Sequence, residues 1–434
     1  MSTACAEMTV LEPLPRSVIE ARLASLLADL DVPAVGVRGP GRPAVLPATI
    51  LWTALAVGVL RGFTSQRALW RLVSLQGLWD YPRVPIGDKA LYKRLTSDGP
   101  AVVRDLFTDI TTVLLATAPA PRVVLAPFAT TVVALDETTL DQVARTLPAL
   151  RAVPVGDRRL LPGKVAAVFD LRQQLFRHVQ FIPAPLHNEK AAARSLLAAV
   201  PPGSLVVADL GYFGFRWFDE LTAHGYHWVS RLRAKTSLLP VHTLYQDATR
   251  TDELVWLGMY RADRARHLVR LISIQRGATV HRYLTNVCDP HQLPAAEVVA
   301  VYGERWTIEQ VFKVVKRDLH LHLLWSAKPT VVAAQVWAVV LIAQVIGAIR
   351  GELAAQAAVP IAEVSLPLLL ETLPALAARH DDPLAILVAE ARRFHIIRPT
   401  RRIRRVMPPI DPACYVLPPP DLVTERHPRY AGKL

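Results

Sequence analysis

The order of strand-like and helical segments between residues 123 and 233 constrains the fold more than any other feature. Helical patterns rich in Ala and Leu occupy residues 189–200 and 215–223. Short β-branched and apolar runs, each typical of a buried strand, occupy residues 131–135, 165–171, 175–182 and 205–208. This order, with three strands before the first helix, predicts a mixed α/β fold in which helices pack on one sheet.

Two of these apolar runs lead directly into an aspartate. Asp136 follows the run VVAL, and Asp209 follows the run LVVA. A carboxylate at the end of a buried strand is costly unless it is paired or binds a cation. Each aspartate alone also fits a turn or helix-capping residue. Because the arrangement occurs twice, we favour a shared site.

Four further polar residues lie on residues 294–319, which the apolar pattern predicts to be one long helix. Tyr302, Arg305, Glu309 and Lys316 are spaced so that, at about 100° per residue, they fall within a sector of roughly 60°. Arg305 and Glu309 also fit an ordinary i, i+4 salt bridge. The neighbouring apolar residues, Trp306 among them, predict that the helix is docked and that Trp306 packs in the core.

These residues carry a resemblance to a known family. Their spacing, Y-x2-R-x3-E-x6-K, resembles the signature of the IS-four family of bacterial insertion-sequence transposases. The DET sequence at Asp136 is similar to the first-aspartate motif of that family, and DLGYF at Asp209 is similar to the second. The resemblance covers residues 125 to 325 closely. It departs from the best-studied members at Leu210 and Gly211, where they have Arg-Glu.

The resemblance implies a ribonuclease H-like catalytic core whose triad, Asp136, Asp209 and Glu309, binds two Mg²⁺ or Mn²⁺ ions. Oxygen-only ligands suit these cations, and two ions about 4 Å apart can activate a nucleophile and stabilise the leaving oxygen. The implied enzyme is a DNA transposase that excises and integrates its own insertion sequence by phosphodiester hydrolysis and strand transfer. A metal-dependent nuclease without strand transfer and a catalytically silent DNA-binding regulatory derivative stay open as alternatives.

The charge balance agrees with a nucleic-acid partner. The net charge of +13 and the pI near 9.9 indicate a polyanionic partner. The resemblance implies double-stranded DNA, both terminal inverted repeats and target, and a homodimer that pairs the two ends in a synaptic complex. Candidate DNA-binding residues beside the triad are Tyr302, Arg305 and Lys316. Candidates elsewhere are Lys89, Lys93 and Arg94 on a helix beginning at Asp88, and Arg401 and Arg402 in the basic tail.

We expect five parts along the chain. They are a helical N-terminal DNA-binding domain (1–120), the first part of the core (121–233), a β-rich insertion (234–292), the second part of the core with the catalytic helix (293–378) and a basic C-terminal arm (379–434). The insertion contains seven arginines. They fit either a surface facing a polyanion or a solvated strand face.

Residues 330–349 contain no charge and are long enough to cross a bilayer. Because Gln335 and Gln344 interrupt them and no second such segment occurs, a buried core helix is predicted and no membrane partner. The three cysteines lack paired or metal-binding spacing, and the N-terminus does not read as a signal peptide. The expected location is the bacterial cytoplasm, in association with the nucleoid.

Overall fold

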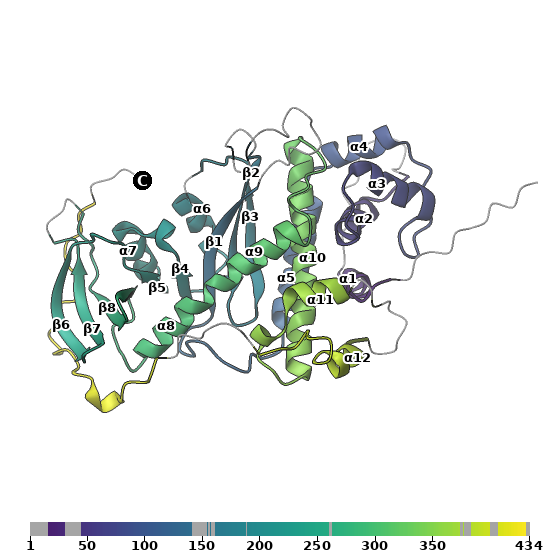
Figure 1. The fold of residues 1–434 in the computed structure, drawn as a ribbon. Coiled ribbons are helices and arrows are strands. Elements are labelled where there is room, and N and C mark those ends of the chain that lie inside the picture. The colour runs from purple at the N-terminus through teal and green to yellow at the C-terminus, as the bar shows by residue number, and fades with distance from the viewer. Residues whose placement is uncertain are drawn as a thin grey trace, which may run out of the picture. The chain divides into compact units, whose positions relative to one another are not determined.

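The structure is a computed structural model of the whole chain (Figure 1). It describes residues 16–30, 45–140, 154, 157, 161–187, 189–259, 263–373, 376, 383–399 and 407–430. The chain forms two compact units. The first unit contains residues 1–118, 140–162 and 313–398, and the second contains residues 119–139, 163–312 and 399–434.

The described residues of the first unit are helical. Its helices are α1 (Val18–Asp29), α2 (Ala48–Leu60), α3 (Gln66–Arg71), the π-helical turn Leu72–Gln76, α4 (Asp88–Ser97), α5 (Ala101–Thr117), α10 (Pro329–Gln356), α11 (Leu366–Thr372) and α12 (Pro383–Glu390). Helix α10 packs against α2 and α5. The predicted helix beginning at Asp88 is present as α4. Helix α2 ends two residues before Gly62, which has the positive φ of +70° that favours glycine, and Ser65 caps α3.

Helix α10 is the long apolar segment of the sequence. Of the described helices it is the one long and apolar enough to cross a membrane, but 94% of its most apolar window is buried inside the protein. Its polar side chain Gln335 is also buried, because it accepts the Trp325 amide at 3.0 Å and donates to the Leu323 carbonyl at 2.8 Å. The prediction of a buried core helix is therefore confirmed.

The second unit is built on one nine-stranded sheet with the order β3-β2-β1-β4-β5-β9-β8-β7-β6. Strand β1 (Val132–Leu140) pairs in parallel with β4 (Leu205–Ala208), and β4 pairs in parallel with β5 (His227–Arg231). Strands β2 (Gly163–Asp170) and β3 (Leu175–Ile182) form an antiparallel pair beside β1. Helices α6 (Glu189–Leu197) and α7 (Phe215–Ala223) connect β3 to β4 and β4 to β5. The predicted mixed α/β fold is confirmed, and the order 3-2-1-4-5 is ribonuclease H-like.

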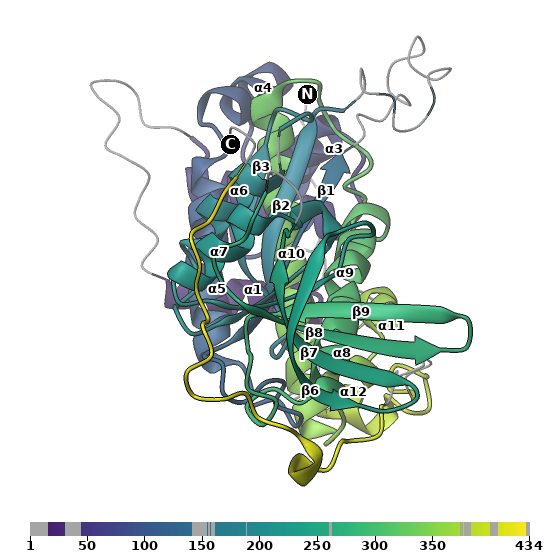
Figure 2. The ribbon, with the colours of Figure 1, turned by 90° about the vertical axis from the view of Figure 1, so that its left-hand side faces the viewer.

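The predicted insertion extends this sheet instead of forming a separate one. Its strands are β6 (Leu238–Gln246), β7 (Arg250–Leu257), β8 (Val269–Arg276) and β9 (Thr279–Thr285). Strand β9 pairs antiparallel with β5, so that Thr285 lies opposite Val229. Figure 2 shows these strands running across the direction of β2 and β3, as the accumulated twist of a large sheet requires.

Several arginines of the insertion are bound within the protein. Arg270 is fully buried and donates two hydrogen bonds to Asp252, at 2.6 and 2.7 Å. Arg250 is paired with Asp247 at 2.7 Å. Arg282 is exposed on β9. Arg261 lies outside the described residues. The sequence offered two interpretations of these arginines, a surface facing a polyanion and a solvated strand face. Neither describes Arg270, which has a structural role inside the sheet.

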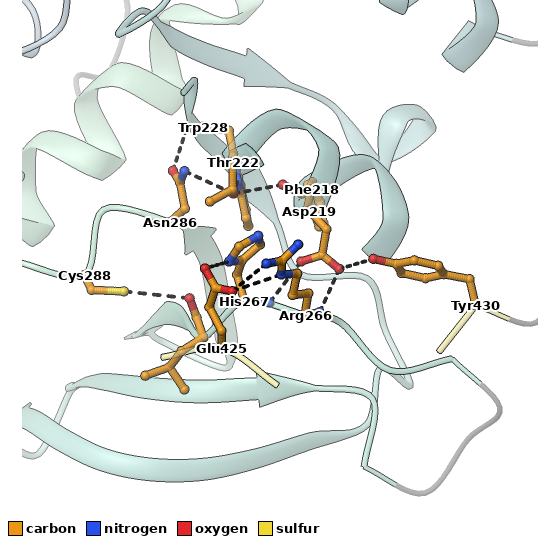
Figure 3. Close-up of polar contacts among 11 residues, drawn as sticks. Phe218, Asp219, Thr222, Trp228, Arg266, His267, Asn286, Cys288, Glu425 and Tyr430 are labelled. Carbon is orange, nitrogen blue, oxygen red and sulfur yellow. Dashed lines mark hydrogen bonds and ion pairs between the residues drawn. The ribbon is translucent and has the colours of Figure 1, made fainter. Parts of the chain in front are cut away.

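The described part of the C-terminal tail docks on the insertion. Figure 3 shows Asp219 of α7 accepting the amides of Arg266 and His267, at 2.7 and 3.0 Å, and the hydroxyl of Tyr430 at 2.6 Å. Glu425 pairs with Arg266 at 2.8 Å. Residues 407–430 are therefore part of the second unit. The expected DNA contacts Arg401 and Arg402 lie outside the described residues.

Candidate active site

Two of the three predicted carboxylates lie on neighbouring parallel strands. Leu135 of β1 is level with Ala208 of β4, so the residues that follow them, Asp136 and Asp209, are adjacent across strands about 4.8 Å apart. Asp209 ends β4 as expected, and its carboxylate accepts the Gly211 amide at 2.8 Å as the cap of the next turn. The prediction that Asp136 ends its strand is wrong, since β1 continues to Leu140.

The third carboxylate lies on a helix that is shorter than predicted. Instead of one helix over residues 294–319, the structure has α8 (Ala295–Glu304) and α9 (Trp306–Arg317), separated at Arg305. The Arg305 amide bonds to the Tyr302 carbonyl and the Ile308 amide to the Arg305 carbonyl, both at 3.3 Å and both spanning three residues. This tighter pattern interrupts the α-helix. The geometry of a continuous helix face therefore holds within α9, between Glu309 and Lys316, which are about two turns apart.

Asp136 shows that the three carboxylates share one electrostatic environment. The pKa of Asp136 is raised from 3.8 to about 7, chiefly by burial. The charges of Asp209 and Glu309 contribute to this rise, whereas the Glu137 amide and the charge of Arg305 oppose it. A buried carboxylate among like charges is a site that a cation would stabilise, and its all-oxygen donor set fits Mg²⁺ or Mn²⁺.

Arg305 balances the charge of Glu309 in this structure. Its guanidinium donates to Glu309 at 2.5 Å. Across the described ranges of the chain, no three Asp, Glu, His or Cys side chains are close enough together to hold a metal ion. The i, i+4 salt bridge that the sequence allowed is thus present, and the residue types of a metal site surround it.

The other predicted residues of this helix are held in different ways. The Tyr302 ring lies between two neighbours, with its centroid 5.4 Å from the Tyr283 ring of β9 and 5.9 Å from the Arg305 guanidinium. Burial raises the pKa of Tyr302 above 10.0. Lys316 lies in the last turn of α9. Tyr302 and Arg305 are therefore fixed beside the carboxylates.

The prediction for Trp306 is wrong. Trp306 was expected in the core but is 54% exposed, because α9 begins at this residue, directly after the interruption at Arg305. Arg94, a candidate DNA contact, has partners within the protein: Asp98 binds its guanidinium at 2.9 Å and the Leu46 carbonyl accepts another of its hydrogen bonds. Arg94 therefore anchors α4 within the first unit.

Sequence reasoning also missed residues around the triad. Lys313 is exposed on α9, one turn beyond Glu309. Its i, i+4 spacing from Glu309 was the sequence signal that could have placed it on the same helix face. Glu137 follows Asp136 and forms a buried ion pair with Lys164 of β2. Because successive side chains of a strand point to opposite faces, Glu137 lies on the other face of the sheet from Asp136. The alternation of side chains along β1 was the sequence signal that Asp136 and Glu137 face opposite sides of the sheet.

Two aspartates beside each other on parallel strands, with a glutamate on a later helix, are the arrangement expected of a domain of the DDE class. The chain belongs to the family described as Transposase DDE domain, whose sequence profile matches residues 129–345.

Individual transposases resemble the chain over shorter stretches. The transposase for insertion sequence element IS231F of Bacillus thuringiensis subsp. israelensis is 21% identical over 201 residues, which cover 45% of this chain and 40% of the relative. Transposase InsG for insertion sequence element IS4 of Escherichia coli (strain K12) is 25% identical over 170 residues, covering 36% and 37%. The chain thus matches about two fifths of the length of each relative.

A solved structure also overlays on the chain. It is the cryo-EM structure of the piggyBac transposase synaptic complex with hairpin DNA, with a TM-score of 0.41 and 9% identity. The overlay covers 86% of this chain and 81% of that chain.

The raised pKa of Asp136 predicts a pH-dependent stability in the absence of metal. Since the folded-state pKa lies above the ordinary 3.8, stability is greatest below that value and is lost as pH rises towards about 7. Asp136→Asn, which cannot ionise, should therefore melt above the wild type in EDTA, by a margin that grows from pH 4 to pH 7 and is then constant. Thermal melting across this range tests it, with Asp421→Asn at an exposed site as control. A difference in melting temperature between Asp136→Asn and the wild type that does not change with pH would contradict this prediction.

Proposed function

We propose that the chain is a DNA transposase that cuts at the ends of its own insertion sequence and joins them to target DNA. The observation that supports this proposal is that Asp136 and Asp209 lie side by side on neighbouring parallel strands, where the charges of Asp209 and Glu309 both act on Asp136, in a chain of the transposase DDE domain family. Both relatives named above are transposases of insertion sequences. The reaction class is phosphoryl transfer at a phosphodiester bond.

Asp136, Asp209 and Glu309 are the residues that would hold two divalent cations, Mg²⁺ or Mn²⁺. When bound, such ions lower the pKa of an attacking water or 3′-hydroxyl and stabilise the leaving oxygen. Asp136 gives up its proton for this purpose, because only the carboxylate form is a ligand. The carboxylates thus have a chemical role that explains why an aspartate is buried at this point of β1.

Arg305 has two roles in this proposal. Before DNA binds, its guanidinium neutralises Glu309, as the 2.5 Å contact supports. With a divalent cation held by the carboxylates, the Arg305 guanidinium would no longer be needed to neutralise Glu309 and would bind a phosphate oxygen through its fork of N–H donors. The Tyr302 ring packs beside the Arg305 guanidinium and orients it. Lys316, about two turns beyond Glu309, contacts a neighbouring phosphate. Arg305 therefore acts as a counter-ion that is exchanged on substrate binding.

The DNA substrate has two parts, the terminal inverted repeats and the target. The net charge of +13 supports a polyanionic partner. Lys89 and Lys93, both exposed on α4, contact the repeats, and Arg401 and Arg402 of the basic tail bind DNA or a second copy. Two copies form a synaptic homodimer, because paired ends require two active sites. The protein acts in the cytoplasm on the nucleoid.

An assay of strand transfer separates this function from its two alternatives. The substrate is a plasmid carrying the native element, incubated with Mg²⁺ or with EDTA, and a second reaction supplies a pre-cut end with a 3′-hydroxyl and a target plasmid. We expect Mg²⁺-dependent excision and joined products, neither of which Asp136→Ala should form. Cleavage without joining would identify a nuclease. Specific end binding without cleavage would identify a regulatory derivative.

A further inference from the structure

A groove with a volume of about 380 Å³ lies in the helical unit, which contains none of the three residues of the proposed triad. Figure 1 shows α4 beside one end of α10, and the groove is formed where they meet. The residues that line it are Lys89, Tyr92, Lys93, Thr96, Ser97 and Lys328. Three cations and three hydroxyls thus face one groove, and no carboxylate from the described part of the chain lines it.

Lysine is rare in this sequence, so the presence of three lysines in one groove is informative. The chain has nine lysines among its 50 basic residues, and three of the nine line this groove. Two of them, Lys89 and Lys93, are one helical turn apart on α4, whose opposite face buries Leu91 and Leu95. Side chains at this spacing begin roughly 6 Å apart and project together. Their arrangement is therefore set by the packing of α4.

Nearby acidic groups are engaged by other partners. Asp98 at the end of α4 binds Arg94, and Asp88 at its beginning accepts the Lys89 amide at 2.7 Å. No described ion pair includes Lys89, Lys93 or Lys328, and all three are exposed. The ammonium groups of the groove therefore form no ion pair with the described carboxylates of their own helix.

Lys328 brings a second source of positive potential to the groove. It is the N-cap residue of the 28-residue helix α10, and among the described residues no side chain caps that terminus. The N-terminus of a helix carries a partial positive charge and unpaired amides, both of which favour anions. A Ser, Thr, Asp or Asn side chain at this position would accept hydrogen bonds from the amides. Lysine cannot accept them, and its charge adds to the positive potential.

We propose that this groove, formed by Lys89, Lys93 and Lys328 with the hydroxyls between them, grips the phosphate backbone of duplex DNA regardless of base sequence. This inference rests on the proposed function for its ligand and adds Lys328, which follows the catalytic helix in sequence, to the DNA-contacting surface. Lysine ammonium groups and hydroxyls contact phosphates without reading bases. The groove therefore contributes affinity and position, and sequence recognition must come from other residues.

The proposal predicts a change in the salt dependence of binding. Each phosphate contact adds about 0.9 to the slope of log affinity against log salt concentration. Lys328→Gln should lower that slope by about 1, and the triple variant Lys89→Gln/Lys93→Gln/Lys328→Gln by about 2 to 3. The loss should be equal for a terminal-repeat duplex and an unrelated duplex. Fluorescence anisotropy in EDTA, across about 50 to 200 mM salt, measures both.

Two controls define the outcomes. Arg122→Gln removes the same charge from an exposed residue outside the groove and should leave the slope unchanged. Lys328→Arg should keep the wild-type slope. The proposal is overturned if Lys328→Gln behaves like Arg122→Gln, or if its effect is confined to the terminal repeat. Since EDTA prevents cleavage, a changed slope without any strand transfer in Mg²⁺ would reject the proposed transposase and retain the groove, and the reverse result would reject the groove alone.

Discussion

Glu309→Gln is expected to abolish strand cleavage while DNA binding stays close to that of the wild type. The substitution keeps the size of the side chain but removes the charge that a divalent cation needs, so the rate should fall by about 10³-fold or more. It also removes the partner that holds Arg305 at 2.5 Å, which should leave the guanidinium available to phosphate. Cleavage of a supercoiled plasmid carrying the native ends in Mg²⁺, and binding of the same ends in Ca²⁺, measure the two effects.

Glu304→Gln is the matched control for this experiment. Glu304 ends α8, five residues before Glu309, and accepts a hydrogen bond from Thr307 at 3.3 Å. It is not among the charges that shift the pKa of Asp136. Cleavage by Glu304→Gln should therefore match the wild type. If Glu309→Gln cleaved DNA at a comparable rate, the assignment of the triad would be rejected.

Arg270→Ala should be the most destabilising single substitution in the insertion. Arg270 and Asp252 are 0% and 2% exposed, and Arg270 also donates to the Leu293 carbonyl at 2.6 Å. Removing the arginine leaves a buried carboxylate without its partner, which costs about 3 to 5 kcal/mol. The loss should lower the melting temperature of the protein, because the insertion is part of the same sheet as β1 and β4.

A double variant tests whether the cost comes from the unpaired charge. Arg270→Met/Asp252→Leu replaces both buried groups by apolar ones and should be markedly more stable than Arg270→Ala, since no buried charge is left. As a control, Arg282→Ala removes an exposed arginine from β9 and should change the free energy of unfolding by less than about 0.5 kcal/mol. If the effects of the two substitutions on the free energy of unfolding were simply additive, so that the double variant was no more stable than their sum predicts, this explanation would be contradicted.

The mixed sheet and the apolar core helix were predictable because both depend on local patterns. Strand segments and helices with strong apolar periodicity form wherever they can bury that surface, so their order along the chain fixed the fold class. The side-by-side placement of two of the proposed carboxylates was predictable for a related reason. Asp136 and Asp209 each follow an apolar run, and parallel pairing brings the ends of such runs together.

The interruption at Arg305 was not predicted, because the apolar period continues through Trp306 and Ile308. The one local signal is Gly303, two residues before the junction, and a single glycine is also tolerated inside a continuous helix. Exposure of Trp306 follows from that interruption. The roles of arginines were equally hidden, since Arg94, Arg270 and Arg282 look alike in sequence. Only their partners distinguish a buried anchor from an exposed cation.

The sequence by itself determined the fold class, because periodicity sets the order of strands and helices. It also led us to propose the three carboxylates, through motifs that resemble those of a known family, and a polyanionic partner, through the net charge. The tertiary structure alone decided which cations remain exposed to a ligand. It buried Arg270 against Asp252, engaged Arg305 with Glu309, and placed Lys328 beside Lys89 and Lys93 from a point more than 200 residues away. Ion pairing and groove formation depend on contacts between distant segments, and no local pattern encodes the distance between two side chains.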